Sequence, residues 1–186
     1  YPLVTGVQTC ALPIYQAELM DFAVVMLQKE VAQRLMAQPG SKEYGAPTVL
    51  LAACAEVRPL LAVNPAEFHP RPKVDSLVIR IDFHPRPKRV QDLGAFDRKL
   101  FTRIVHAAFG QRRKTLLNGL AAARVLDEKE KLAEAILAAR VSPSDRAETL
   151  SLEQFVTLTR ELSKALASLS PHLLPPTTTH QEQHHE

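Results

Sequence analysis

At 186 residues the chain is roughly 1.2 times the length of an average domain, so we expect one domain with an appendage rather than two full domains. Its 46% hydrophobic and 23% charged residues suit a globular protein with a packed core, and they exclude a chain that is disordered throughout. The six glycines stand apart from one another, which excludes a glycine-rich loop that cradles a phosphate or a dinucleotide.

The chain contains no apolar run near the roughly 20 residues that cross a bilayer, and no basic stretch precedes an apolar one at its start. We therefore expect a cytoplasmic protein with no membrane partner. Cys10 and Cys54 form neither a disulfide framework nor a metal-ligand spacing, so no metal is expected. The tail histidines His180, His184 and His185 are better explained by a solvated tail than by a metal site.

The net charge of +3 conceals an uneven distribution along the chain. Residues 69–124 hold 13 Lys or Arg against 4 Asp or Glu, whereas the remainder holds 10 against 16. A basic segment of this kind is typical of a surface that faces a polyanion such as a nucleic acid. An ordinary solvated charged face explains it equally well.

Residues 1–14 have no capping residue, no hydrophobic periodicity and two prolines, and they resemble a translated sequencing adapter. We interpret them as non-native and expect the genuine sequence to begin near Tyr15, with its N-terminal portion missing. The apolar run over 22–27 then predicts a strand buried on both faces of a parallel sheet. Residues 30–37 predict a helix ended by a Pro-Gly pair, and 48–55 predict a buried helix, with a strand as the alternative.

Two further strands are predicted on either side of a proline-rich loop. Residues 57–63 form one, interrupted by a proline, and the alternating apolar residues of 74–83 form the clearest strand of the chain. Prolines fix φ in the loop 64–73, so this loop is stiff. The hexapeptide FHPRPK begins at Phe68 and again at Phe83; we expect both copies to place Arg and Lys at the same end of the sheet, with coincidence as the alternative.

After Pro87 only helices are predicted, namely four short helices, each with one apolar stripe. The last helix follows a capping box formed by Ser151 and Gln154. From residue 168 onward the composition cannot bury a core, and 168–186 reads as a disordered tail. The stripes are Leu93, Phe96, Leu100, Ile104 and Ala108; Leu116, Leu117 and Leu120; Leu132, Ile136 and Leu137; and Phe155, Leu158, Leu162 and Leu166.

No Ser-His-Asp, paired-carboxylate or metal-ligand spacing stands out, and His106 on a helical stripe is better explained as a structural or surface residue. Three segments are more informative. They are Met26-Leu-Gln-Lys-Glu-Val31, Phe68-His-Pro-Arg-Pro-Lys-Val-Asp-Ser76 and Phe109-Gly-Gln-Arg-Arg-Lys-Thr115.

In this order and spacing the three segments resemble the ribosomal RNA adenine dimethyltransferase family, in particular its small-subunit member linked to kasugamycin sensitivity. The string Arg146-Ala-Glu-Thr-Leu-Ser151 before the last helix fits that member too. The resemblance covers residues 15–166, and its strings are specific.

The resemblance implies an α/β plus all-α fold. Residues 15–90 would be the C-terminal part of a Rossmann-like S-adenosylmethionine methyltransferase sheet, and 91–167 a small helical rRNA-binding domain. The family dimethylates N6 of two adjacent adenosines near the 3′ end of small-subunit rRNA, so the implied partners are this rRNA and the pre-assembled small ribosomal subunit, bound by a monomer. The family's glycine-rich cofactor loop, acidic ribose-binding residue and Asn-Leu-Pro-Tyr motif have no match here. We therefore expect the S-adenosylmethionine site to be absent and the chain to be inactive alone.

The resemblance also implies that Phe68 contacts the target adenine; the alternative is that Phe68 plugs the core beneath its loop. Gln28 and Lys29 follow the first strand, where open α/β sheets bind ligands, and we expect them to bind substrate, the alternative being an ordinary helix entry. Arg71 and Lys73 are weaker candidates for substrate contacts. The weaker candidates for RNA contacts are Arg71, Lys73, Arg86, Lys88 and Arg89.

Arg112, Arg113 and Lys114 are expected at the start of the second C-terminal helix. There their side chains would point in different directions around the helix and contact the backbone of an RNA on both sides. The alternative is that they only solubilise the start of the helix. Two other functions stay open, namely a catalytically silent RNA-binding module and a large-subunit rRNA methyltransferase of the macrolide-resistance type. The string that begins at Phe109 favours the small subunit.

Overall fold

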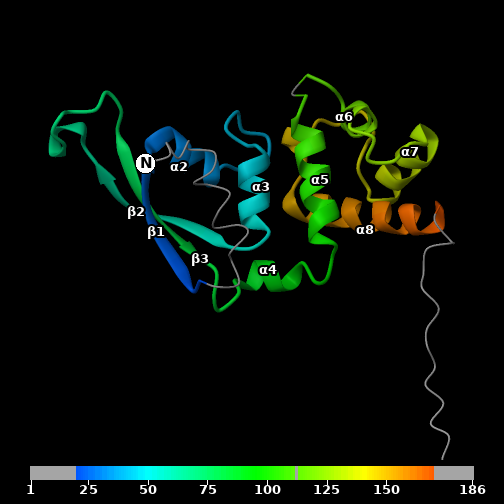
Figure 1. Cartoon of the computed structure of the whole chain (residues 1–186), viewed down its shortest axis with the longest axis horizontal. Helices are drawn as coiled ribbons and strands as arrows, with labels where there is room; N and C mark the ends of the chain where they lie inside the picture. The colour runs from blue at the N-terminus through cyan, green and yellow to red at the C-terminus, as the bar shows by residue number, and fades with distance from the viewer. Residues whose placement is uncertain (1–19, 112, 170–186) are drawn as a thin grey trace, which may run out of the picture.

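The computed structural model of the chain describes residues 20–111 and 113–169. The adapter-like residues 1–14 and the tail from residue 170 onward lie outside the described residues, as does Arg112. In the described part, a small sheet carries two helices on one face, and a group of further helices lies beyond them (Figure 1). No helix of the described part is long and apolar enough to cross a membrane.

The sheet has three strands in the order β1-β3-β2, with β1 at Phe22–Gln28, β2 at Glu56–Val63 and β3 at Ser76–Asp82. The central β3 pairs antiparallel with both neighbours, so β1 and β2 run in the same direction. All three strands were predicted in these places. The prediction that the first strand pairs in a parallel sheet is wrong for the described strands, because β1 hydrogen-bonds to β3 in the antiparallel sense.

The prediction that the first strand is buried on both faces is wrong for the described part of the chain. Exposure alternates along β1, and its inward residues pack against the cluster beneath the sheet. Phe22, Val24 and Met26 point to the other face and remain about half exposed, at 51%, 52% and 52%. A continuous apolar run does not show which faces of a strand the rest of the fold covers. The pattern therefore could not distinguish a strand buried on both faces from one with an exposed face.

The proline inside β2 bends the strand without ending it. The register with β3 shifts between Pro59 and Leu61, which leaves one extra residue in β2. Proline cannot donate a hydrogen bond to a ladder, and it is tolerated at bulges and on edge strands such as β2. The predicted interruption is therefore confirmed as a β-bulge.

Helices α2 (Lys29–Leu35) and α3 (Ala46–Ala52) cover the inner face of the sheet, and 48–55 is thereby settled mainly as helix. The side chains of α3 divide between two buried clusters. Leu51 packs with the sheet, whereas Val49 and Leu50 pack with the helices that follow. We call β1–β3 with α2 and α3 the sheet part and α4–α8 the helical part; α3 joins their cores.

The helical part contains α4 (Lys88–Asp92), α5 (Arg98–Phe109), α6 (Leu116–Ala122), α7 (Lys129–Ala138) and α8 (Leu152–Leu169), with 3-10 turns η2 (Pro65–Glu67) before it and η3 (Ala147–Thr149) within it. These helices enclose the larger cluster, which includes the fully buried Ile104, Leu120, Leu132, Ile136 and Phe155. The predicted helix order is confirmed, although α8 is 18 residues long rather than short.

Two details of the predicted stripes differ in the structure. The first stripe is split, because Gly94 takes φ +64 and Asp97 caps a new helix by accepting hydrogen bonds from the Lys99 and Leu100 amides. Leu137 is 60% exposed and does not belong to the core. The capping box is confirmed: the Ser151 amide donates to Gln154 Oε1 at 2.8 Å, and the Gln154 amide donates to Ser151 Oγ at 3.3 Å.

Helices α6 and α7 end in the same tetrapeptide, Ala-Ala-Arg-Val. In each, the arginine adopts a left-handed φ, 49° at Arg124 and 58° at Arg140. The following valine amide donates to the carbonyl five residues back, and the arginine amide donates three residues back, the two bonds of a Schellman motif. Both valines, Val125 and Val141, are buried, so one local sequence ends both helices in one way.

Candidate functional site

The carboxyl ends of β1 and β2 meet at one edge of the sheet. Gln28 closes β1 and Val63 closes β2, and both are paired with Ser76 at the start of β3. Ligands of open α/β sheets bind at the carboxyl ends of the strands. The predicted placement of Gln28 and Lys29 at this edge is confirmed, and both are exposed there. Their role in binding substrate stays a prediction.

The proline-rich loop that leaves this edge is fixed at both ends. At its start, Asn64 Oδ1 accepts a hydrogen bond from the Ala66 amide at 2.9 Å, which opens η2. At its end, the Lys29 amide donates to the Asp75 carbonyl at 2.9 Å, and Lys29 Nζ lies 3.6 Å from Asp75 Oδ2. The exposed ion pair contributes little by itself, so the backbone hydrogen bond is the firmer tie.

This tie joins two of the three segments singled out in the sequence. Asp75 is a residue that the sequence analysis did not name as part of the site, although it belongs to the quoted string that begins at Phe68. The sequence feature that could have identified Asp75 is its position in that string. Its contact with Lys29 became visible only in the fold, since 46 residues separate the two along the chain.

Phe68 and Phe83 begin identical hexapeptides but lie in different surroundings. Phe83 is 1% exposed and belongs to the cluster under the sheet. Phe68 is half-buried, and it is absent from the residues that form or pack against either core cluster of the described chain. The alternative that Phe68 plugs the core therefore has no support in the structure, whereas Phe83 has that role.

The two hexapeptides also lie at opposite ends of β3, because the first precedes this strand and the second follows it. The expectation that both place Arg and Lys at the same end of the sheet is wrong. Only Arg71 and Lys73 of the first copy share the edge of Gln28. Both are exposed, and neither forms an ion pair among the residues that the structure describes.

Arg113 and Lys114 do not lie on a helix. They belong to the turn between α5 and α6, where the Lys114 amide donates to the Gln111 carbonyl at 2.9 Å. The expected helix start is wrong because Thr115 is the N-cap: its Oγ1 accepts from the Asn118 amide, and α6 begins only at Leu116. Both cations are exposed, and Arg112 lies outside the described residues. In Figure 1 this turn and the loop after β2 both lie on the upper side of the molecule.

Residues 145–150, which overlap the string before the last helix, make hydrogen bonds to the start of α6 and to the loop between α2 and α3. The Leu116 amide, at the start of α6, donates to the Asp145 carbonyl at 2.7 Å. The Gly40 amide donates to the Glu148 carbonyl at 2.7 Å, and the Tyr44 hydroxyl donates to the Leu150 carbonyl at 2.9 Å. The segment around residues 145–150 thus ties α6 to the loop between α2 and α3.

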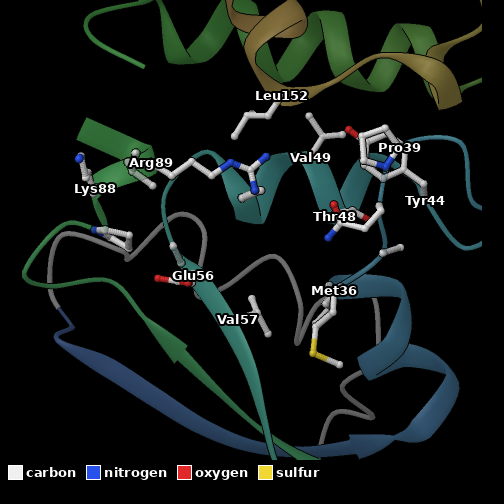
Figure 2. Close-up of a pocket in the computed structure, with 17 residues that line it drawn as sticks. Met36, Pro39, Tyr44, Thr48, Val49, Glu56, Val57, Lys88, Arg89 and Leu152 are labelled. Carbon is white, nitrogen blue, oxygen red and sulfur yellow. The ribbon is translucent and has the colours of Figure 1, made fainter. Parts of the chain in front are cut away.

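A cavity of about 390 Å³ lies between the two parts, lined by α3, by the start of β2 and by α4 (Figure 2). Glu56, the first residue of β2, and Arg89 lie on its wall. It therefore sits at the end of the sheet opposite the Phe68 loop. Its lining contains no glycine and no strand carboxyl end, so these residues do not fit S-adenosylmethionine. No cluster that suits a metal ion occurs in the described chain.

A sequence profile described as "Ribosomal RNA adenine dimethylase" matches residues 12–164. The chain belongs to this family. A "Ribosomal RNA small subunit methyltransferase A" of Desulfotalea psychrophila is 45% identical to it over 154 residues, which cover 78% of this chain and 51% of the relative. The chain thus spans about half the length of this relative.

Two crystal structures share the fold. One is a dimethyladenosine transferase from Plasmodium falciparum, with a TM-score of 0.66 and 23% identity over 83% of this chain and 62% of the other. The second is the 23S rRNA methyltransferase ErmE, with a TM-score of 0.54 and 20% identity over 87% of this chain and 63% of the other. These likenesses confirm the predicted fold class, a sheet of the methyltransferase type followed by helices.

Proposed function

We propose that this chain is part of an rRNA adenine dimethyltransferase that uses S-adenosylmethionine to methylate N6 of two adjacent adenosines near the 3′ end of small-subunit rRNA. Family membership and the printed name of the 45% identical relative support the substrate. The observation that carries the proposal is Phe68, held in a fixed loop at the carboxyl edge of the sheet and outside both cores.

The chemistry explains why an aromatic residue is useful at this edge. The exocyclic amine of adenine is a poor nucleophile because its lone pair is delocalised into the ring, so its orientation must be controlled. S-adenosylmethionine supplies an electrophilic methyl group when bound. An enzyme that acts on a base takes it out of the stack, and an aromatic side chain stabilises the extruded base by about 1–3 kcal/mol. Phe68 performs this stacking in our proposal.

The other predicted residues have supporting roles in this proposal. Arg71 and Lys73 lie on the same loop as Phe68 and contact the phosphates beside the extruded adenosine. Lys29, through Asp75, fixes the end of that loop. Arg113, Lys114 and their neighbour Arg112 contact the rRNA backbone farther from the base.

We also propose that the chain by itself binds no S-adenosylmethionine and has no activity. Its sequence has no match to the family's glycine-rich loop or Asn-Leu-Pro-Tyr motif, and the lining of the cavity described above does not fit the cofactor. Isothermal calorimetry with the chain and S-adenosylmethionine should show no binding heat at micromolar protein. The complete enzyme acts as a cytoplasmic monomer on pre-assembled small subunits.

A chimera tests the proposed function. The N-terminal half of the Desulfotalea psychrophila relative is joined to residues 20–169 of this chain, and transfer of radiolabelled methyl groups is measured on purified small and large ribosomal subunits. We expect methylation of small subunits, and a loss of roughly 5- to 150-fold with Phe68→Ala, the factor that corresponds to 1–3 kcal/mol of stacking. Phe68→Tyr, which keeps the ring, is the matched control.

Three outcomes contradict the proposal. A chimera that methylates only large subunits assigns the chain to the macrolide-resistance type. A chimera that binds small subunits and S-adenosylmethionine but transfers no methyl group assigns it to the silent RNA-binding class. Full activity of the Phe68→Ala chimera removes Phe68 from the site.

A further inference from the structure

The outward face of α5 carries a row of basic residues that the proposed function does not use. Lys99, Arg103 and His106 recur at spacings of four and three residues, and all three are exposed. Residues at these spacings lie on one face of a helix. The opposite face of α5 is buried through Leu100 and Ile104, among others, so the helix that carries these residues is packed against the core.

A fourth basic residue is placed beside this row by the fold. The Arg103 guanidinium donates a hydrogen bond to the carbonyl oxygen of Arg124, 21 residues further on. Arg124 is the exposed left-handed residue that ends α6. We call Lys99, Arg103, His106 and Arg124 the α5 basic face. None of the four forms an ion pair with a carboxylate in residues 20–111 and 113–169.

This face is continuous with the cationic turn described above. Helix α5 ends at Phe109 and leads within four residues to Arg113 and Lys114. At about 1.5 Å per residue the row from Lys99 to His106 rises about 10 Å, so together with the turn beyond α5 the basic residues can face more than one phosphate of a polynucleotide backbone. A single phosphate group does not need such a surface.

The face has the features of a surface for duplex RNA rather than for a single strand. Single-stranded RNA is held largely by bases that stack on exposed aromatic rings. Both phenylalanines of α5 are engaged inside the protein: Phe101 packs on Phe96, and Phe109 packs between Tyr44 and Phe155. Proteins recognise duplex RNA mostly by its shape and its phosphates. Such recognition requires cationic side chains held on a rigid element, as they are on α5.

We propose that the α5 basic face binds the phosphate backbone of an rRNA helix, as a second contact surface beyond the turn of Arg113 and Lys114. The proposal rests on the proposed function, because it assigns more of the rRNA-binding surface of the same protein. Lys99, Arg103 and Arg124 each contact a phosphate, and His106 donates a hydrogen bond at the end of the row.

The test measures binding of the full chain to a fluorescent RNA hairpin of about 20 base pairs, a length that covers the roughly 16 base pairs contacted by compact duplex-binding domains. Fluorescence anisotropy gives the affinity over a series of salt concentrations. The test variant is Lys99→Gln/Arg103→Gln/Arg124→Gln. The control Lys129→Gln/Arg140→Gln/Lys164→Gln removes as much charge from α7 and α8, and its Arg140 ends α7 just as Arg124 ends α6.

Each phosphate contact adds about 0.9 to the slope of log affinity against log salt. Loss of three contacts should therefore make the fall in affinity between about 50 and about 200 mM salt roughly 40-fold smaller than for the unchanged chain. The control should keep the original slope. Arg103→Lys, which retains the charge and removes the guanidinium contact with Arg124, should also keep it, which separates a lost phosphate contact from a loosened α6.

Equal effects of the test and control variants overturn the proposal, because they indicate a response to net charge alone. An unchanged slope in the test variant, together with a lower slope in Arg113→Gln/Lys114→Gln, also overturns it and leaves the proposed function intact. Preference for an unstructured oligonucleotide over the hairpin contradicts the duplex assignment. If the unchanged chain binds neither RNA at about 50 mM salt, both proposals lose their support.

Discussion

The Tyr44 hydroxyl donates a hydrogen bond to the backbone carbonyl of Leu150, 106 residues further along the chain. Tyr44 lies in the connection between α2 and α3, and Leu150 lies just before α8. The tyrosine is 5% exposed, and burial raises the pKa of its hydroxyl to about 12. This contact links the sheet part to the helical part through one buried polar group.

Tyr44→Phe should lower the free energy of unfolding by about 0.5–1.5 kcal/mol, because it leaves the Leu150 carbonyl without its donor. The effect should depend on pH. The folded-state pKa is raised, so this stabilisation is complete below the unfolded pKa of about 10 and is lost as the pH rises toward about 12. Urea unfolding at about pH 8 and about pH 11 should show the gap between wild type and variant closing at the higher pH. A gap that is equal at both values contradicts this account.

The two FHPRPK copies provide a matched pair for stability. Phe83→Ala should cost about 3–5 kcal/mol, because it opens a cavity in the cluster under the sheet. Phe68→Ala should change stability by less than about 1 kcal/mol, since Phe68 belongs to neither cluster. Chemical denaturation followed by circular dichroism measures both. Similar large losses in the two variants would place Phe68 in the core after all.

The arginine that ends α7 offers a stabilising change. Arg140 has φ 58°, a region that glycine adopts without a steric penalty, and Arg140→Gly should raise stability by about 0.5–1 kcal/mol. Thermal unfolding should show a higher midpoint. Arg124→Gly, at φ 49°, should give a similar gain and also weaken RNA binding, because Arg124 belongs to the α5 basic face. A destabilised Arg140→Gly protein would show that the arginine side chain makes compensating contacts.

Asp82 should contribute to stability against acid. Hydrogen bonds from Arg80 at 2.6 Å and from Arg58 at 3.3 Å hold the pKa of Asp82 below its usual range. A lowered folded-state pKa stabilises the protein above the unfolded value of about 3.9, and this contribution is lost as the pH falls through the folded-state pKa.

Asp82→Asn should therefore lose less stability than wild type on acidification from about pH 6 to about pH 3. Thermal midpoints across this range measure the difference. Asp92→Asn, which removes a carboxylate that forms no ion pair in the described chain, is the control. Identical acid profiles for wild type and Asp82→Asn would contradict the assignment.

The positions of strands and helices could be predicted because their local signals are strong. Alternating residues marked β3, and the pair Ser151 and Gln154 marked the start of α8. The surroundings of these elements could not be predicted in the same way. Whether β1 is covered on its outer face depends on what packs there, and Leu137 continues a stripe in the sequence although nothing covers it in the described fold.

The candidate site was predicted by its strings rather than by its geometry. Gln28 and Lys29 could be placed because the end of a strand is a local property. The tie between Lys29 and Asp75 required the antiparallel pairing of β1 with β3, which the apolar run did not indicate. The cations before α6 were misplaced because a single capping residue, Thr115, determined the helix start.

Helix α3 has a mechanical consequence for the RNA binding proposed above. Because Leu51 is buried in the cluster under the sheet and Leu50 in the cluster of the helical part, neither part can move relative to the other without breaking buried apolar contacts of α3. The distance between the Phe68 loop and the α5 basic face is then fixed by the fold. In the proposed complex, the bound RNA must match that distance, so the protein would select its RNA by length as well as by charge.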